Sequence, residues 1–199
     1  MGWDYEPISV AESVIISAAI VDPMSATISS PTDDVTGNLI SIDQAHHEIH
    51  DGDHFFYTDS VLLGNAATQD YLITTPDTTK YCHLFFVLDG STIVQWDLYE
   101  SSDKLGTTPQ TAFNSNRNSL TAPTLAIAKG TSGGTTDGTL LQTYKCGSST
   151  AQAKSPTLSR NIDEIILKRN TKYILRTTSG AASNLTNVRL TWYEHVNAT

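Results

Sequence analysis

The stretch TIVQWDLYE, residues 92–100, decides the fold class because its side chains alternate in character. Val94, Trp96 and Leu98 share one side of an extended chain, and the other side carries Ile93, Gln95, Asp97 and Tyr99. Side chains of a β-strand point alternately to its two faces, so this strand would bury one face and wet the other. The stretch NVRLTWYEH, residues 187–195, repeats the pattern. Together the two stretches predict an antiparallel β-domain.

Further extended segments follow at a spacing near the roughly 8–12 residues typical of sandwiches and barrels. Most are bounded by Gly, Pro, Asn, Asp or Ser, which favour turns. We predict an all-β fold, an antiparallel β-sandwich of jelly-roll-like type, as a domain over residues 39–199. The predicted strands are LISID (39–43), HHEIH (46–50), HFFYTDSVLL (54–63), DYLITT (70–75), YCHLFFVL (81–88), TIVQWDLYE (92–100), LTAPTLAIA (120–128), TLLQTYKC (139–146), IDEIILKR (162–169), TKYILRTTS (171–179) and NVRLTWYEH (187–195).

Residues 1–38 differ in character and are predicted to form an extended N-terminal arm and connector. They carry aromatic and apolar residues but too few to build a core of their own. Such an arm needs a surface to pack on, either its own domain or a neighbouring subunit. The candidate anchors of the arm at such an interface are Trp3, Tyr5, Ile15 and Ile16.

The overall charge limits the classes of partner. The formal net charge is −9, whereas nucleic-acid binding needs a basic surface, so we predict no nucleic-acid partner. No apolar run reaches the roughly 18 residues of a membrane-spanning helix, and acidic rather than basic residues precede the apolar stretch 14–21. We therefore expect no membrane partner and no export signal.

The strongest candidates for a metal site are His46, Glu48 and His50 in the segment HHEIH. On a strand these three side chains would share one face, and imidazole and carboxylate are both zinc ligands. The segment does not match the helical H-E-x-x-H motif, and histidines also serve in polar interface networks. We predict no metal and no cofactor, and keep a metal-dependent enzyme built on this cluster as an alternative.

No catalytic residues are predicted. The sequence lacks a G-x-S-x-G nucleophile motif, and neighbouring carboxylates such as Asp163 and Glu164 point apart on a strand. The Gly-rich stretch 130–139 lacks the Lys-Ser/Thr pair of a phosphate-binding loop, so we expect a surface hairpin loop there. The protein is therefore predicted not to be an enzyme.

Two cysteines, Cys82 and Cys146, lie in strand-like runs and are expected to be buried thiols, with a disulfide between them left open. The hairpin around Asn170 is expected to give that residue a positive φ.

The aromatic residues divide into two groups. Trp96 and Trp192 are in phase with aliphatic residues and are expected in the core. Tyr99, Tyr193 and Trp3 remain candidates for an exposed platform that stacks on sugar rings.

Several phrases in order carry a resemblance to a known group of proteins. They are HHEIHDGDHFFYTD (46–59), DYLITTPDTTK (70–80), EIILKRNTKYILRTTSGAASN (164–184) and the terminal WYEH (192–195). The segment from Ala45 to His195 resembles a group of tailed-bacteriophage virion proteins that are encoded near the major capsid protein and regarded as head decoration or structural proteins.

The resemblance implies a β-rich protein without a catalytic site, made in the host cytoplasm and located on the outer surface of the virion capsid. It implies a decoration, or cement, protein that binds and stabilises the mature shell. The implied partners are the major capsid protein and copies of the chain itself, with a trimer favoured. The alternative is another virion component, such as a head-fibre base or a tail or baseplate adhesin that binds host-surface glycan.

Overall fold

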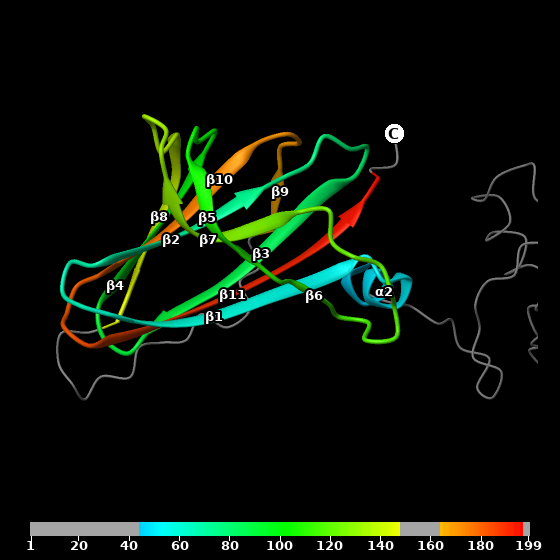
Figure 1. Cartoon of the computed structure of the whole chain (residues 1–199). Coiled ribbons are helices and arrows are strands. Elements are labelled where there is room, and N and C mark those ends of the chain that lie inside the picture. Colours follow the sequence, from blue (N-terminus) through cyan, green and yellow to red (C-terminus); the bar gives the residue numbers. More distant parts are fainter. Residues whose placement is uncertain (1–43, 148–163, 197–199) are drawn as a thin grey trace, which may run out of the picture. The chain divides into compact units, whose positions relative to one another are not determined.

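The computed structural model describes residues 44–147 and 164–196, and these residues form strands apart from one helix and the connecting loops (Figure 1). The helix is α2 (Gln44–Asp51). The strands are β1 (His54–Leu63), β2 (Thr68–Thr74), β3 (Tyr81–Gly90), β4 (Val94–Glu100), β5 (Leu105–Gln110), β6 (Phe113–Asn114), β7 (Ala126–Ser132), β8 (Thr139–Cys146), β9 (Ile165–Leu167), β10 (Lys172–Ser179) and β11 (Asn184–His195). The arm predicted over 1–38 and its anchors lie outside the described residues.

The strands form two sheets with only antiparallel neighbours among the described residues. The five-stranded sheet has the order β6-β1-β11-β3-β9, and the six-stranded sheet has the order β5-β7-β2-β10-β4-β8. The first four strands pair in reverse order with the last four: β1 with β11, β2 with β10, β3 with β9 and β4 with β8. This is a jelly roll with β5, β6 and β7 inserted between β4 and β8. The predicted antiparallel sandwich is confirmed.

The core lies between the two sheets, and the alternating strands supply it. Val94, Trp96 and Leu98 are buried together on β4, as their spacing predicts. Trp192 is fully buried on β11, where its ring centroid lies 5.8 Å from that of Phe55. Asp97 is also buried, although it faces away from the core, and its carboxylate accepts hydrogen bonds from Thr143 and Gln95.

One predicted strand is wrong, because HHEIH belongs to the helix α2. Gly52 directly follows the last helical residue, Asp51, and has a φ of 80°. The amide of Gly52 donates a hydrogen bond to the carbonyl of Ile49, and the amide of Asp53 donates to the carbonyl of Glu48, as at many helix C-termini. A Cβ at Gly52 would lie 2.4 Å from Oγ of Ser119, so the position requires glycine both for its backbone and for space.

The inserted strands differ most from the prediction. β5 and β6 were not predicted, and the stretch predicted as a strand over 120–128 becomes extended only from Ala126. β5 contains Gly106 and Pro109, which argue against a central strand but are tolerated on an edge such as this one. Gly106 also permits close packing, since a Cβ there would lie 2.4 Å from Cβ of Ala128.

The Gly-rich stretch 130–139 is not a hairpin loop. It joins β7 to β8, and these strands are separated by β2, β10 and β4 in the same sheet. Asp103 holds it in place by accepting hydrogen bonds from the amides of Thr135 and Thr136. The turn at Asn170 is as predicted, with a φ of 47°.

Cys82 and Cys146 are both buried, so the prediction of buried cysteines is confirmed, and no disulfide joins them. Burial, with a further contribution from the charge of Glu194, raises the pKa of Cys82 to about 12. No helix among the described residues is both long and apolar enough to cross a membrane.

Candidate functional site

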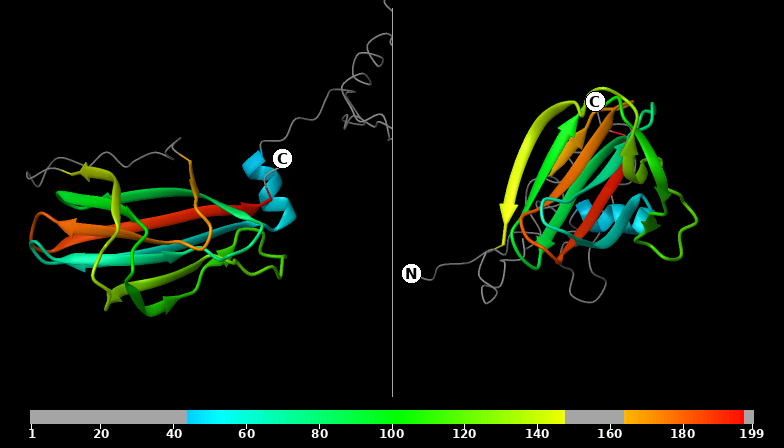
Figure 2. Two further views of the ribbon diagram at one scale, coloured as in Figure 1. Left: turned by 90° about the horizontal axis from the view of Figure 1, so that it is seen from above. Right: turned by 60° about the vertical axis from the view of Figure 1, so that its left-hand side comes forward.

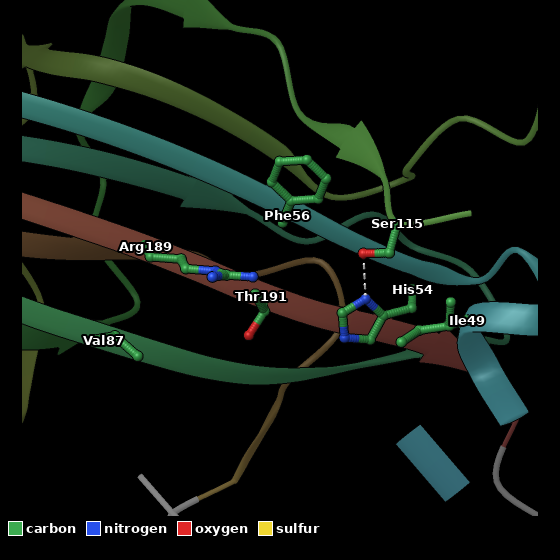
Figure 3. Close-up of a pocket in the computed structure, with 7 residues that line it drawn as sticks. All are labelled: Ile49, His54, Phe56, Val87, Ser115, Arg189 and Thr191. Carbon is green, nitrogen blue, oxygen red and sulfur yellow. Dashed lines mark hydrogen bonds between the residues drawn. The ribbon is translucent and has the colours of Figure 1, made fainter. Parts of the chain in front are cut away.

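A groove of about 680 Å³ lies on the outer face of the five-stranded sheet, at the end where α2 packs (Figure 3). α2 stands at the end of the sandwich where β1 begins and β11 ends, as the left view of Figure 2 also shows. The groove is lined by Ile49, His54, Phe56, Val87, Ser115, Arg189 and Thr191.

Strand register brings these residues together from distant parts of the sequence. Phe56 on β1 lies opposite Thr191 on the central strand β11, and Arg189 lies opposite Val87 on β3. All four side chains share the face that points away from the core, because the intervening residues, such as Leu190, are buried. The floor of the groove therefore combines an aromatic ring, a hydroxyl, an aliphatic side chain and a guanidinium.

The wall of the groove is built by β6 and the loop after it. Asn114 donates a hydrogen bond from Nδ2 to the carbonyl of Gly52 at 2.6 Å, which joins this segment to the end of α2. The Oγ of Ser115 lies 2.7 Å from Nδ1 of His54, and its amide donates to the carbonyl of His54. His54 and Ser115 are thus held rigidly on one side of the groove.

Arg189 differs from the cations of this chain that pair with carboxylates. Lys80 pairs with Asp53, and Lys129 pairs with Asp59. Arg189 is exposed, and none of its contacts within residues 44–147 and 164–196 is an ion pair or hydrogen bond. Its guanidinium extends toward the middle of the ring of lining residues in Figure 3. The groove therefore holds an uncompensated positive charge on a chain whose net charge is −9.

A second cluster lies beside the groove on the same sheet face, where Glu164 joins His83 and Tyr193. Oε1 of Glu164 accepts a hydrogen bond from the Tyr193 hydroxyl at 2.5 Å and is also hydrogen-bonded to Nδ1 of His83. The His83 and Tyr193 rings stack with centroids 4.5 Å apart. Tyr193 is buried, so the interpretation of this residue as an exposed sugar platform is wrong. Tyr99 is half-buried beneath the guanidinium of Arg176.

The histidine-rich segment does not have the geometry that a strand would give it. On α2, His46 and His50 lie one turn apart on an exposed side, with 2.9 Å between their Nε2 atoms. Glu48 is buried and points elsewhere. Within the described part of the chain, no group of three or more His, Cys, Asp or Glu side chains is placed to hold a metal ion. The shared face that was expected for His46, Glu48 and His50 is therefore wrong.

The outer face of the six-stranded sheet carries a network of paired charges. Arg176 donates from Nε and Nη2 to the carboxylate of Asp70 at 2.7 and 2.9 Å, and from Nη1 to Asp137 at 2.7 Å. These bonds raise the pKa of Arg176 and lower that of Asp137. Because every partner in this network belongs to the sheet or to the loop 133–138, its role is to hold that loop in place.

Acid should destabilise the sandwich through three carboxylates. Hydrogen bonds from the backbone amides of the loop, of which that of Thr135 contributes most, lower the pKa of Asp103 to about 2. Lys168 lowers the pKa of Glu100, and Arg176 lowers the pKa of Asp137. A carboxylate with a depressed pKa stabilises the fold above its unfolded pKa of about 4, and this contribution is lost as the pH falls through the folded value. We expect the urea midpoint to drop between about pH 5 and pH 2.

The matched measurement uses Asp103→Asn, which should show a smaller drop over the same pH range than the original chain. Asp77→Asn is the control, because Asp77 is exposed and makes no hydrogen bond within the described residues. Equal pH profiles for Asp103→Asn and Asp77→Asn would contradict the role of Asp103.

Comparison with known proteins returns no relative: no protein-family model, curated protein or solved structure matches the chain. Sequence reasoning did not find the groove. The available signal was Arg189, an isolated cation at an outward position of the alternating stretch NVRLTWYEH.

Proposed function

We propose that the chain is a structural protein of a tailed-phage virion, which decorates the outer surface of the mature capsid and stabilises it. The observation that carries the proposal is an exposed apolar tip at the end of the sandwich away from α2. Leu62 on β1 and Leu185 on β11 lie directly opposite each other on the outer sheet face. They are 67% and 44% exposed.

Exposed leucines that face each other at a rigid tip favour contact with another protein, since large apolar side chains gain free energy when they leave water. The next pair of outward residues along these strands, Ser60 and Asn187, is polar. The Ser60 hydroxyl donates a hydrogen bond to Oδ1 of Asn187 at 2.6 Å. Ile93, at the same end of the sandwich, is 36% exposed. An apolar centre with a polar rim is the usual composition of a protein interface.

The proposed partners are the major capsid protein and further copies of this chain, with a trimer favoured. A protein that binds only the mature lattice stabilises it by mass action, and several linked copies turn modest contacts into strong attachment. The resemblance of residues 45–195 to phage virion proteins that are regarded as head decoration or structural proteins supports this role. Trp3, Tyr5, Ile15 and Ile16 of the arm are the second proposed contact.

The test mixes the full chain with purified capsids that lack it and measures bound protein by co-sedimentation and gel densitometry against the major capsid band. The double change Leu62→Asp and Leu185→Asp should abolish most of the bound fraction, because it places charges in an apolar contact. Leu120→Asp is the matched control, since Leu120 is 100% exposed on a loop. Full occupancy with the double variant would contradict the proposed surface.

Deletion of residues 2–38 tests the arm in the same assay. We expect reduced occupancy, and unchanged occupancy would remove the arm from the proposal. Copy number separates the alternatives: a stoichiometry comparable with that of the major capsid protein fits a shell component, whereas a few copies per particle fit a tail or vertex component.

A further inference from the structure

We propose that the groove beside α2 binds a carboxylate-bearing sugar residue of a glycan, with Arg189 as the group that recognises the carboxylate. This binding function is separate from capsid attachment and uses the opposite end of the sandwich. Three features support it: the unpaired charge of Arg189, the shape and chemistry of the groove, and its position on a sheet face.

The charge of Arg189 selects an anion. A guanidinium offers a planar fork of donors that matches the two oxygens of a carboxylate. Arg176, on the other sheet, shows the same pairing with Asp70 inside this chain. Arg189 has no such carboxylate within the described residues, so a ligand from outside can supply it.

The remaining lining suits a pyranose ring. Phe56 offers a half-buried aromatic ring, and aromatic rings stack on the apolar C–H face of sugars. Thr191, which lies opposite Phe56, presents a hydroxyl that forms no hydrogen bond within the described part of the chain. Ser115 and His54 place further polar atoms on the wall. The volume of about 680 Å³ lies within the range of small-ligand sites, roughly 300–1,000 Å³.

The position of the groove favours a sugar over an acidic peptide. Extended peptides gain affinity by adding to the free edge of a sheet, where backbone groups are unpaired. The groove lies over β11, which is hydrogen-bonded to β1 on one side and to β3 on the other along most of its length. A peptide on this face would find no backbone partners, whereas a sugar needs only the side chains.

The groove and the apolar tip are far enough apart to act independently. Phe56 and Leu62 both face outward on β1, and six residues of strand separate them by about 20 Å. A protein attached through Leu62 and Leu185 would therefore leave the groove open to a second ligand.

Isothermal titration calorimetry of the full chain tests the proposal with four probes. Trigalacturonate and 3′-sialyllactose carry the carboxylate from two glycan sources, and neutral trigalactose and lactose are their matched controls. We expect heat of binding from at least one acidic probe and a Kd at least about tenfold weaker for its neutral counterpart. The acidic probe that binds identifies the source. Absence of binding by both acidic probes, or equal binding of acidic and neutral probes, would overturn the proposal.

Variants then assign the contact. Arg189→Gln should abolish binding and Arg189→Lys should weaken it, because lysine keeps the charge but loses the fork. Lys145→Gln is the control, since it removes an exposed cation from β8 in the other sheet. Unchanged binding by Arg189→Gln, with the thermal midpoint of the original chain, would overturn the assignment, as would tighter binding of a pentaglutamate peptide than of either acidic sugar.

The double variant Leu62→Asp and Leu185→Asp should bind the acidic probe as the original chain does. This measurement keeps the two functions distinguishable, because failure of capsid attachment leaves glycan binding intact. Loss of glycan binding in that double variant would contradict the independence of the two sites.

Discussion

Glu194→Ala is expected to lower the free energy of unfolding by at least about 3 kcal/mol, because it leaves two buried and two part-buried donors without an acceptor. Glu194 is 1% exposed, near the end of β11. Its carboxylate accepts hydrogen bonds from the amides of Thr124 and Leu125, from the Thr124 hydroxyl at 2.6 Å and from Nε1 of Trp192. Each donor loses its partner in the variant, and the buried donors of Leu125 and Trp192 find little water to replace it.

The effect should be large because Glu194 joins two parts of the fold. Thr124 and Leu125 immediately precede β7, in the segment inserted between β4 and β8, and Leu125 belongs to the core. Glu194 therefore fixes the loop that closes this end of the core onto the central strand of the opposite sheet. Loss of the carboxylate would loosen the loop and let water reach Trp192.

Urea unfolding followed by circular dichroism measures this change, with Glu194→Gln as the companion variant. Glutamine keeps the volume but offers one acceptor oxygen and directs its NH2 group at the remaining donors. A substantial loss in both variants shows that the carboxylate oxygens matter rather than the volume. Asp77→Ala, on the surface, should stay within about 0.5 kcal/mol. Stability of Glu194→Gln equal to that of the original chain would contradict the argument.

The sequence predicted the parts of this fold that depend on local periodicity. Alternation placed Trp96 and Trp192 in the core, and the strand count favoured the jelly-roll arrangement that the pairing of β1 with β11 and β4 with β8 confirms. The helix α2 was missed because its decisive signal is the cap at Gly52, whereas the alternation of HHEIH fits a short strand equally well.

The groove could not be predicted because it depends on register between distant strands. Phe56, Val87 and Arg189 meet only through the pairing of β1, β11 and β3, and Ser115 joins them only through the two-residue strand β6. Single-sequence patterns give the face of each residue but not which neighbour lies across from it. The outward position of Arg189 was visible, and its lack of a partner was not.

The two core tryptophans should respond differently to the same change, Trp→Phe. Both are buried, but Nε1 of Trp192 donates to Glu194 at 3.0 Å, whereas Nε1 of Trp96 has no hydrogen-bond partner within the described residues. The void beside Trp96 is about 10 Å³, the lower limit for holding one water. Trp96→Phe therefore removes an unsatisfied donor along with its apolar surface, while Trp192→Phe also leaves a buried carboxylate short of one bond.

We expect Trp192→Phe to cost about 1–2 kcal/mol more than Trp96→Phe, which is the price of the lost bond to a charged acceptor. The alanine variants serve as the reference, since both create large cavities and should each cost about 3–5 kcal/mol. Urea midpoints and slopes from circular dichroism provide the four values on one scale. If the two phenylalanine variants lose the same free energy while both alanine variants unfold cooperatively, the bond between Trp192 and Glu194 contributes nothing, and the large effect expected for Glu194→Ala would have to arise from the Thr124 and Leu125 donors alone.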